Sequence, residues 1–245
     1  MIEVRDLRVS YGGRVVADVP ELDVGAGECV AIVGESGSGK STTLLSLLGL
    51  TPDAEISGHV SVCGVDVLTA PPRRLREIRG ARVALVMQSP QAALSPATRL
   101  GVLMRRALKL HGRGRVEETM AQAMDAVLLD REILRRYPHE ISGGQAQRFA
   151  IALAIALGAE VILADEPTSA LDVTVQAEVV GVLHRLRAER GLALLLVSHD
   201  LALVSTIADR VLVMRDGAVV ESGPAARVLS EPAHPYTREL LEALP

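Results

Sequence analysis

The strongest structural signal in the chain is Gly34-Glu35-Ser36-Gly37-Ser38-Gly39-Lys40-Ser41. It fits the pattern G-x-x-x-x-G-K-[ST], in which glycines let the backbone curl until its N–H groups converge on phosphate oxygens. The almost wholly apolar run 28–33 just before it predicts a strand buried on both faces. An apolar helix is predicted over 40–48, with its positive N-terminal end at the loop. A chance match is on the order of 10⁻³ by composition, so we predict a nucleotide-binding loop.

Strand and helix patterns alternate outward from this loop. Strands are predicted at 2–11, 15–24, 56–67, 82–87, 161–164 and 192–197, a hairpin at 209–214 and 218–221, and a helix at 173–190. Residues 99–157 are predicted to be mostly helical, and the arginine-rich stretch 73–82 is interpreted as a solvated face. This alternation favours an α/β core whose parallel sheet is covered on both faces, with a helical insertion at about 90–157.

Composition excludes several kinds of partner. The 245 residues carry 26 Lys+Arg and 30 Asp+Glu, and this net charge of −4 argues against a nucleic-acid groove. The four aromatic residues are too few for a base-stacking platform, and two cysteines are too few for a disulfide framework or a thiolate metal site. No apolar run approaches the ~18 residues that span a bilayer, and no signal segment is recognisable. We expect a cytosolic globular protein.

Two carboxylates follow the predicted strand at 161–164. Strands of such sheets present their C-terminal ends to the ligand, so Asp165 is predicted to bind Mg²⁺ together with the Ser41 hydroxyl. Glu166 is predicted to orient or deprotonate an attacking water. The alternative for this pair is a helix N-cap before Pro167.

A second anion-binding pattern is Ser142-Gly143-Gly144-Gln145, which precedes a predicted helix. Taken alone, such a pattern is more often an ordinary capped turn. One loop already encloses a triphosphate, so two such sites in one chain make sense when each nucleotide is sandwiched between two copies of the domain.

These motifs, in this order along the whole chain, resemble the ATP-binding subunit of an ABC transporter. The resemblance implies that Tyr11 stacks on adenine, that Gln88 touches Mg²⁺ and the attacking water, and that His199 contacts the γ-phosphate. Residues 142–145 correspond to the family signature, with Ile141 where leucine is usual. Ser169-Ala170-Leu171-Asp172 is similar to the loop that contacts the other cassette of the dimer.

The implied fold is a P-loop NTPase (RecA-like) core sheet with N-terminal antiparallel strands and a helical subdomain insertion. We expect one ATP-binding domain over 1–245, with its core at 1–89 and 158–223, the helical subdomain at 90–157 and a short helical tail at 224–245. The expected cofactors are ATP and Mg²⁺. The expected site residues are Glu166, His199 and Gln88 for catalysis; Tyr11, Gly34, Glu35, Ser36, Gly37, Ser38, Gly39, Lys40, Ser41 and Thr42 for ATP; Ser142, Gly143, Gly144 and Gln145 from the other copy; Asp172 in the cross-dimer loop; and Ser41, Gln88 and Asp165 for the metal.

Residues 137–140, 172–177 and 234–238 resemble the oligopeptide, dipeptide and nickel importers. The implied function is ATP hydrolysis that powers import of a peptide or nickel-type solute. The implied partners are permease subunits, a second ATP-binding subunit and, indirectly, an extracytoplasmic solute-binding protein, with the chain peripheral at the cytoplasmic face of the membrane. Two features depart from the usual pattern: Ser89, where an acidic residue is usual, and the end of the chain soon after 234–238. The shorter form resembles nickel-type members. The alternatives are a soluble non-transport ABC ATPase, an exporter subunit and an unrelated P-loop kinase.

Overall fold

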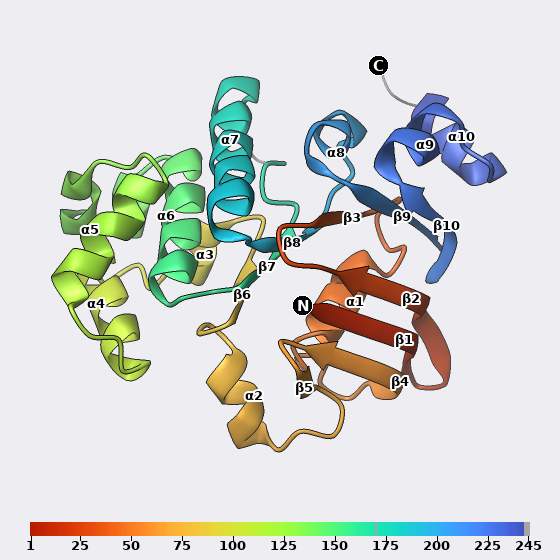
Figure 1. Ribbon diagram of the computed structural model, residues 1–245, viewed down its shortest axis with the longest axis horizontal. Coiled ribbons are helices and arrows are strands. Elements are labelled where there is room, and N and C mark those ends of the chain that lie inside the picture. The colour runs from red at the N-terminus through yellow and green to blue at the C-terminus, as the bar shows by residue number, and fades with distance from the viewer. Residues whose placement is uncertain (170, 243–245) are drawn as a thin grey trace.

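A ten-stranded sheet organises the protein in a computed structural model that describes residues 1–169 and 171–242 (Figure 1). Its strands are β1 (Ile2–Tyr11), β2 (Arg14–Val24), β3 (Cys29–Val33), β4 (Glu55–Val62), β5 (Val65–Asp66), β6 (Val83–Val86), β7 (Val161–Asp165), β8 (Ala193–Val197), β9 (Arg210–Arg215) and β10 (Ala218–Pro224). Their order across the sheet is β5-β4-β1-β2-β10-β9-β3-β8-β7-β6.

The helices are α1 (Lys40–Ser46), α2 (Pro72–Ile78), α3 (Pro90–Ala93), α4 (Leu100–Leu110), α5 (Val116–Ala126), α6 (Gly143–Ala156), α7 (Val173–Arg190), α8 (Leu201–Ile207), α9 (Ala225–Ser230) and α10 (Pro235–Glu242). Short 3₁₀ turns occupy Arg131–Arg135 and Pro138–Glu140. Helices α3 to α6 all lie between β6 and β7 in the chain and gather beside the sheet (Figure 1).

Strand direction divides the sheet in two. Strands β6, β7, β8, β3 and β9 run parallel, whereas β2, β1, β4 and β5 pair antiparallel. The register Val86–Ala164 and Asp165–Val197 brings the carboxyl ends of β6, β7 and β8 to the same edge. Ligands bind at this edge of open parallel sheets, so the topology places the loops that follow these strands together.

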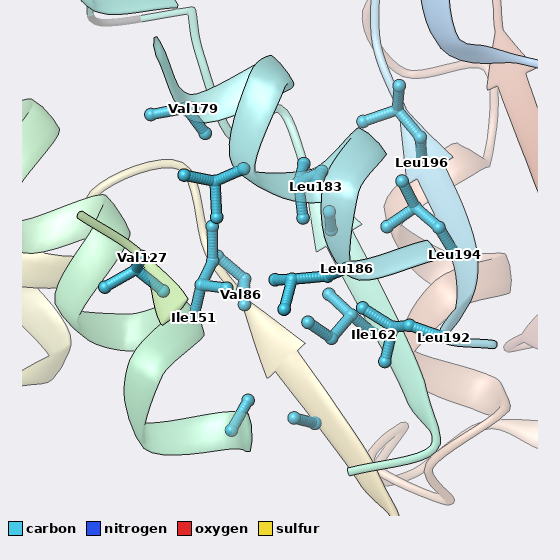
Figure 2. Packing of buried hydrophobic residues seen from close by; sticks show 14 of the residues in the cluster. Val86, Val127, Ile151, Ile162, Val179, Leu183, Leu186, Leu192, Leu194 and Leu196 are labelled. Atoms are coloured by element: carbon cyan, nitrogen blue, oxygen red, sulfur yellow. The ribbon is translucent and has the colours of Figure 1, made fainter. Parts of the chain in front are cut away.

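Each face of the parallel strands supports its own hydrophobic core. In β3, Ala31 faces the core formed with α6 and α7, whereas Ile32 faces the core formed with α1 and the antiparallel strands. Figure 2 shows side chains of α6 and α7 packed on β6, β7 and β8. Burial on both faces explains why these strands have nearly uninterrupted apolar sequences.

The strands predicted along the chain are confirmed, and the predicted region 56–67 contains two of them, β4 and β5. The helix predicted over 173–190 is also confirmed as α7. Helices α2 and α8 were missed because each is only seven residues long, which is too short for a clear helical period. The interpretation of 73–82 as a solvated face is wrong for its last two arginines. Arg79 donates to the carbonyl of Leu48 at 2.7 Å, and Arg82 pairs with Glu160 at 2.6 Å.

Candidate functional site

The glycine-rich loop leaves β3 and enters α1, as its sequence predicts. Gly34 has φ +146, and a Cβ there would lie 2.1 Å from the Met214 carbonyl oxygen. Gly39 has φ +98, and a Cβ there would lie 2.4 Å from the Val16 carbonyl oxygen. Both positions therefore require glycine, because the loop packs directly on the backbone of β2 and β9.

Lys40 lies inside this loop and is 6% exposed. Its Nζ donates to the carbonyl oxygens of Gly34 at 2.7 Å and Glu35 at 2.6 Å. Burial lowers the pKa of the Lys40 ammonium, although the carboxylates of Glu166 and Asp165 favour its charged form. The loop thus holds a partly desolvated cation that an incoming anion would neutralise.

A hollow of about 300 Å³ opens beside Lys40. Its lining combines loop residues, the start of α1 and one carboxylate: Val16, Ser36, Gly37, Gly39, Lys40, Ser41, Thr42 and Glu166. A concave site with an ammonium, a glycine-rich backbone and a helix N-terminus suits a polyphosphate.

Asp165 ends β7 beside the start of α1. Ser41 Oγ donates to Asp165 Oδ1 at 3.2 Å, so the two predicted metal ligands lie next to each other. Burial raises the pKa of the Asp165 carboxyl and the Glu166 charge adds to that rise, whereas Ser41 and Lys40 oppose it. A hydroxyl and a carboxylate are the hard oxygen donors that Mg²⁺ takes, so this pair fits the expected metal.

Replacing Asp165 with Asn is expected to raise the free energy of unfolding of the nucleotide-free chain by about 1 kcal/mol, because it removes a half-buried charge kept for function. The raised pKa means that the folded state favours the protonated acid. The advantage of the variant should therefore shrink as the pH falls through that pKa. Urea unfolding of both proteins at neutral and mildly acidic pH measures this, and a less stable Asn variant at neutral pH would contradict it.

Glu166 and His199 meet at the carboxyl ends of β7 and β8. His199 Nδ1 and Glu166 Oε1 are 3.0 Å apart, and the backbone N–H of Glu166 donates to the Val197 carbonyl at 2.9 Å. Glu166 has φ +46, a strained conformation for a non-glycine residue that is often found at functional sites. The carboxylate also lines a second hollow of about 280 Å³ that His199 borders.

Two polar residues that line this second hollow were not predicted from the sequence. Gln176 donates to Asp200 Oδ2 at 2.8 Å, and Asp200 caps α8 by accepting from the Leu203 N–H at 2.9 Å. Burial alone would raise the pKa of Asp200, but these hydrogen bonds outweigh it and lower the pKa. The proximity of Asp200 to His199 in the sequence was the available signal.

Gln88 and Tyr11 make fewer contacts than the predicted site residues described above. Gln88 is exposed just after β6, at the same sheet edge as Asp165. Tyr11 is 38% exposed at the end of β1 and pairs with Arg14 in the turn to β2. Within residues 1–169 and 171–242, neither side chain forms a hydrogen bond to the residues of the two hollows.

The signature segment forms an N-terminal cap. Ser142 Oγ accepts from the Gln145 N–H at 3.2 Å, and Gln145 Oε1 accepts from the Ser142 N–H at 3.0 Å. Gly144 lies against α7, where a Cβ would come 2.0 Å from Val175 Cγ1. In the part of the chain that the structure describes, residues 142–145 do not line the hollow at Lys40.

The loop predicted to contact the other cassette follows Glu166. Ser169 Oγ donates to the Glu166 carbonyl at 3.1 Å, and Asp172 caps α7 by accepting from the Val175 N–H at 3.0 Å. Ala170 lies outside the described residues. Ser169 therefore contacts the backbone of Glu166, and Asp172 fixes the start of α7.

The chain resembles known proteins both in sequence and in fold. A model of the ABC transporter family matches residues 18–169. The oligopeptide transport ATP-binding protein OppD of Salmonella typhimurium is 41% identical, over 100% of this chain and 76% of its own length. The peptidoglycan transport ATP-binding protein YejF of Agrobacterium fabrum is 41% identical, over 100% of this chain and 47% of its own length. A dimeric structure of the ATP-binding cassette MJ0796 in a post-hydrolysis state with ADP and Pi superposes with a TM-score of 0.80 at 26% identity, covering 92% of this chain and 99% of that one.

Proposed function

This chain belongs to the ABC transporter family, and on that premise we propose that it hydrolyses ATP to power the import of peptides through a membrane permease. The observation that carries the proposal is the Glu166–His199 pair, 3.0 Å apart, beside a loop that buries Lys40. A base next to a polyphosphate site is what hydrolysis of a terminal phosphate needs.

Two cassettes are proposed to close head to tail around two nucleotides. Lys40 and the loop N–H groups hold the phosphates from one side, and Ser142, Gly143 and Gly144 of the other copy approach the γ-phosphate. The position of the Ser142 cap outside the hollow of its own chain supports a contribution from another copy. MJ0796, which shares this fold, is a dimer in both of its compared structures.

Ser41, Asp165 and Gln88 are the residues proposed to hold Mg²⁺. A Mg²⁺ ion held by these residues would supply positive charge that offsets the negative charge developing on the transferred phosphoryl group. The hydrogen bond from Ser41 to Asp165 and the half-buried position of Asp165 support this donor set. Tyr11 is proposed to stack on the adenine ring, and its partly exposed position at the end of β1 is compatible with that contact.

Glu166 is proposed to act as the general base. Its carboxylate accepts a proton from the attacking water, while His199 holds the carboxylate and Gln88 helps to place the water. Lys40 stabilises the charge that accumulates on the terminal phosphate. Catalysis then rests on the position of these groups and on charge neutralisation.

The permease is proposed to dock in an apolar groove between the sheet and the helices of residues 90–157. This groove has a volume of about 320 Å³ and is lined by residues of α3, α4, α6 and β6, among them Met87, Ala93, Leu103 and Leu153. Met87, next to Gln88, is 50% exposed there. In the described ranges, none of the helices has the length and apolar character needed to cross a membrane. The proposed contact with a permease would place the chain at the cytoplasmic face of the membrane as a peripheral subunit.

Ala93→Arg is expected to reduce recovery of the chain with membranes at least tenfold, because it places a large cation in the apolar groove. Ala93 is exposed, so binding of ATP by the purified chain should be unchanged. The matched control is Ala226→Arg, an equally exposed alanine on α9. Quantitative immunoblotting of membrane and soluble fractions measures the effect. Equal recovery of both variants would rule out the groove as the docking site.

The peptide class of cargo is supported by the names of the relatives, and OppD is an oligopeptide transport protein. The alternative of a nickel cargo rested on motifs that peptide and nickel importers have in common and on the short tail. The compared relatives give this alternative no specific support.

A pull-down of the tagged chain from gently solubilised native membranes tests the assembly, with partners identified by mass spectrometry. We expect permease chains, with or without a second ATP-binding subunit, and a co-isolated solute-binding protein. Recovery without any integral membrane partner would contradict the importer and favour a soluble ABC ATPase. A permease that works without a solute-binding protein would favour an exporter.

A further inference from the structure

The tail of the chain reaches the phosphate loop through one residue. Tyr236, at the start of α10, is 1% exposed, and its hydroxyl accepts a hydrogen bond from the Glu35 backbone N–H at 3.0 Å. Tyr236 belongs to the sequence 234–238, which indicates the importer branch but has no part in the proposed mechanism. The contact joins residues 201 positions apart in the chain.

The contact acts on the first peptide unit of the loop. The N–H of that unit belongs to Glu35 and donates to Tyr236, while its carbonyl belongs to Gly34 and accepts from Lys40 Nζ at 2.7 Å. On the side of β9, the Met214 carbonyl leaves no room for a Cβ at Gly34. Tyr236, Lys40 and Met214 thus surround one peptide plane, and Tyr236 is the member that comes from the tail.

Tyr236 is itself held in place by neighbouring strands. The Arg215 guanidinium lies 4.7 Å from the centre of the Tyr236 ring, and Arg215 pairs with Glu239 of α10 at 3.8 Å. Glu221 of β10 accepts from the N–H groups of Ala233 and His234 at 2.8 and 3.0 Å, which fixes the turn before α10. The hydroxyl is therefore presented to the loop by a rigid support.

We propose that Tyr236 is a positioning residue for ATP binding. Its hydroxyl fixes the Gly34–Glu35 peptide, so the loop keeps the backbone orientation in which the following N–H groups and Lys40 converge on the phosphates. This rests on the proposed function, because it assigns a determinant of affinity to the same nucleotide site. Without the hydroxyl, the Glu35 N–H loses its partner and the loop samples other orientations before the nucleotide arrives.

Tyr236→Phe tests this, because it removes the hydroxyl and keeps the ring that Arg215 covers. Binding of a fluorescent ATP analogue with Mg²⁺ to the purified full chain should weaken roughly three- to tenfold. In the ATPase assay of the complex recovered from membranes, KM for ATP should rise by a similar factor while kcat stays within about twofold. Thr237→Val is the matched control, since it removes one buried hydroxyl from the same helix, next to Glu221.

The outcomes separate the inference from the function on which it rests. Weaker binding by Tyr236→Phe with near-wild-type binding by Thr237→Val supports the positioning role. Equal affinity of Tyr236→Phe and the wild type overturns it, and so does an equal loss in both variants, which would indicate general destabilisation of the tail. Two other results would instead contradict the proposed function: no binding of the analogue by the wild type, or equal affinity of the wild type and Lys40→Ala for the analogue.

Discussion

Glu166→Gln is expected to lower the ATPase turnover of the assembled transporter by roughly 10²–10⁴-fold, the contribution typical of a positioned general base. The amide keeps the size of the side chain but does not accept the proton of the attacking water. ATP binding should persist, because Lys40 and the loop are the groups proposed to hold the phosphates. Steady-state release of phosphate, together with the Kd for the fluorescent ATP analogue, measures both quantities.

His199→Ala is the variant to compare with Glu166→Gln. His199 lies 3.0 Å from Glu166 and is proposed to hold the carboxylate and contact the γ-phosphate, so its loss should slow turnover less than loss of the base. If Glu166→Gln hydrolyses ATP at the wild-type rate, then the base is a different group and the assignment at the end of β7 is wrong.

Lys40→Ala is expected to weaken nucleotide binding roughly 10- to 100-fold, because hydrogen bonds to charged groups contribute about 1.5–3 kcal/mol each. The fold should persist, since burial already disfavours the ammonium and lowers its pKa. Isothermal titration with Mg-ATP measures the change in Kd. Turnover at saturating ATP should fall as well, because the same charge is proposed to stabilise the terminal phosphate in the transition state.

The chain offers a matched control for this prediction, because Lys109 is its other lysine and lies exposed on α4. Lys109→Ala removes the same charge far from the loop in sequence and should leave the Kd unchanged. Equal weakening by both substitutions would show that net charge, rather than the loop lysine, controls binding.

Much of the fold follows from local sequence signals. The glycine pattern before Lys40 determines a tight loop, and the apolar strand before Asp165 determines a buried strand whose end faces the ligand. The two predicted elements meet because β3 and β7, the parallel strands on either side of β8, end at the same edge of the sheet. The contact between Ser41 and Asp165, 124 residues apart in the chain, is the result.

Other features depend on contacts that no local pattern specifies. Tyr236 reaches Glu35 only because α10 packs beside the end of β9, and Asp200 meets Gln176 only because α7 and β8 are adjacent. Arg79 and Arg82 look like surface charges in the sequence, yet backbone carbonyls and Glu160 engage them. All of these contacts depend on tertiary packing, and the periodicity of apolar residues along the sequence does not predict them.

Peptide uptake tests the central claim most directly. In cells of the source organism, the chromosomal copy is replaced by the wild type or by Glu166→Gln, and accumulation of a radiolabelled peptide is followed beside that of radioactive nickel. We expect peptide uptake in the wild type, its loss with Glu166→Gln at equal membrane recovery, and no change in nickel uptake. Peptide uptake that continues unchanged with Glu166→Gln would contradict the account, and selective loss of nickel uptake would assign the transporter to a different cargo.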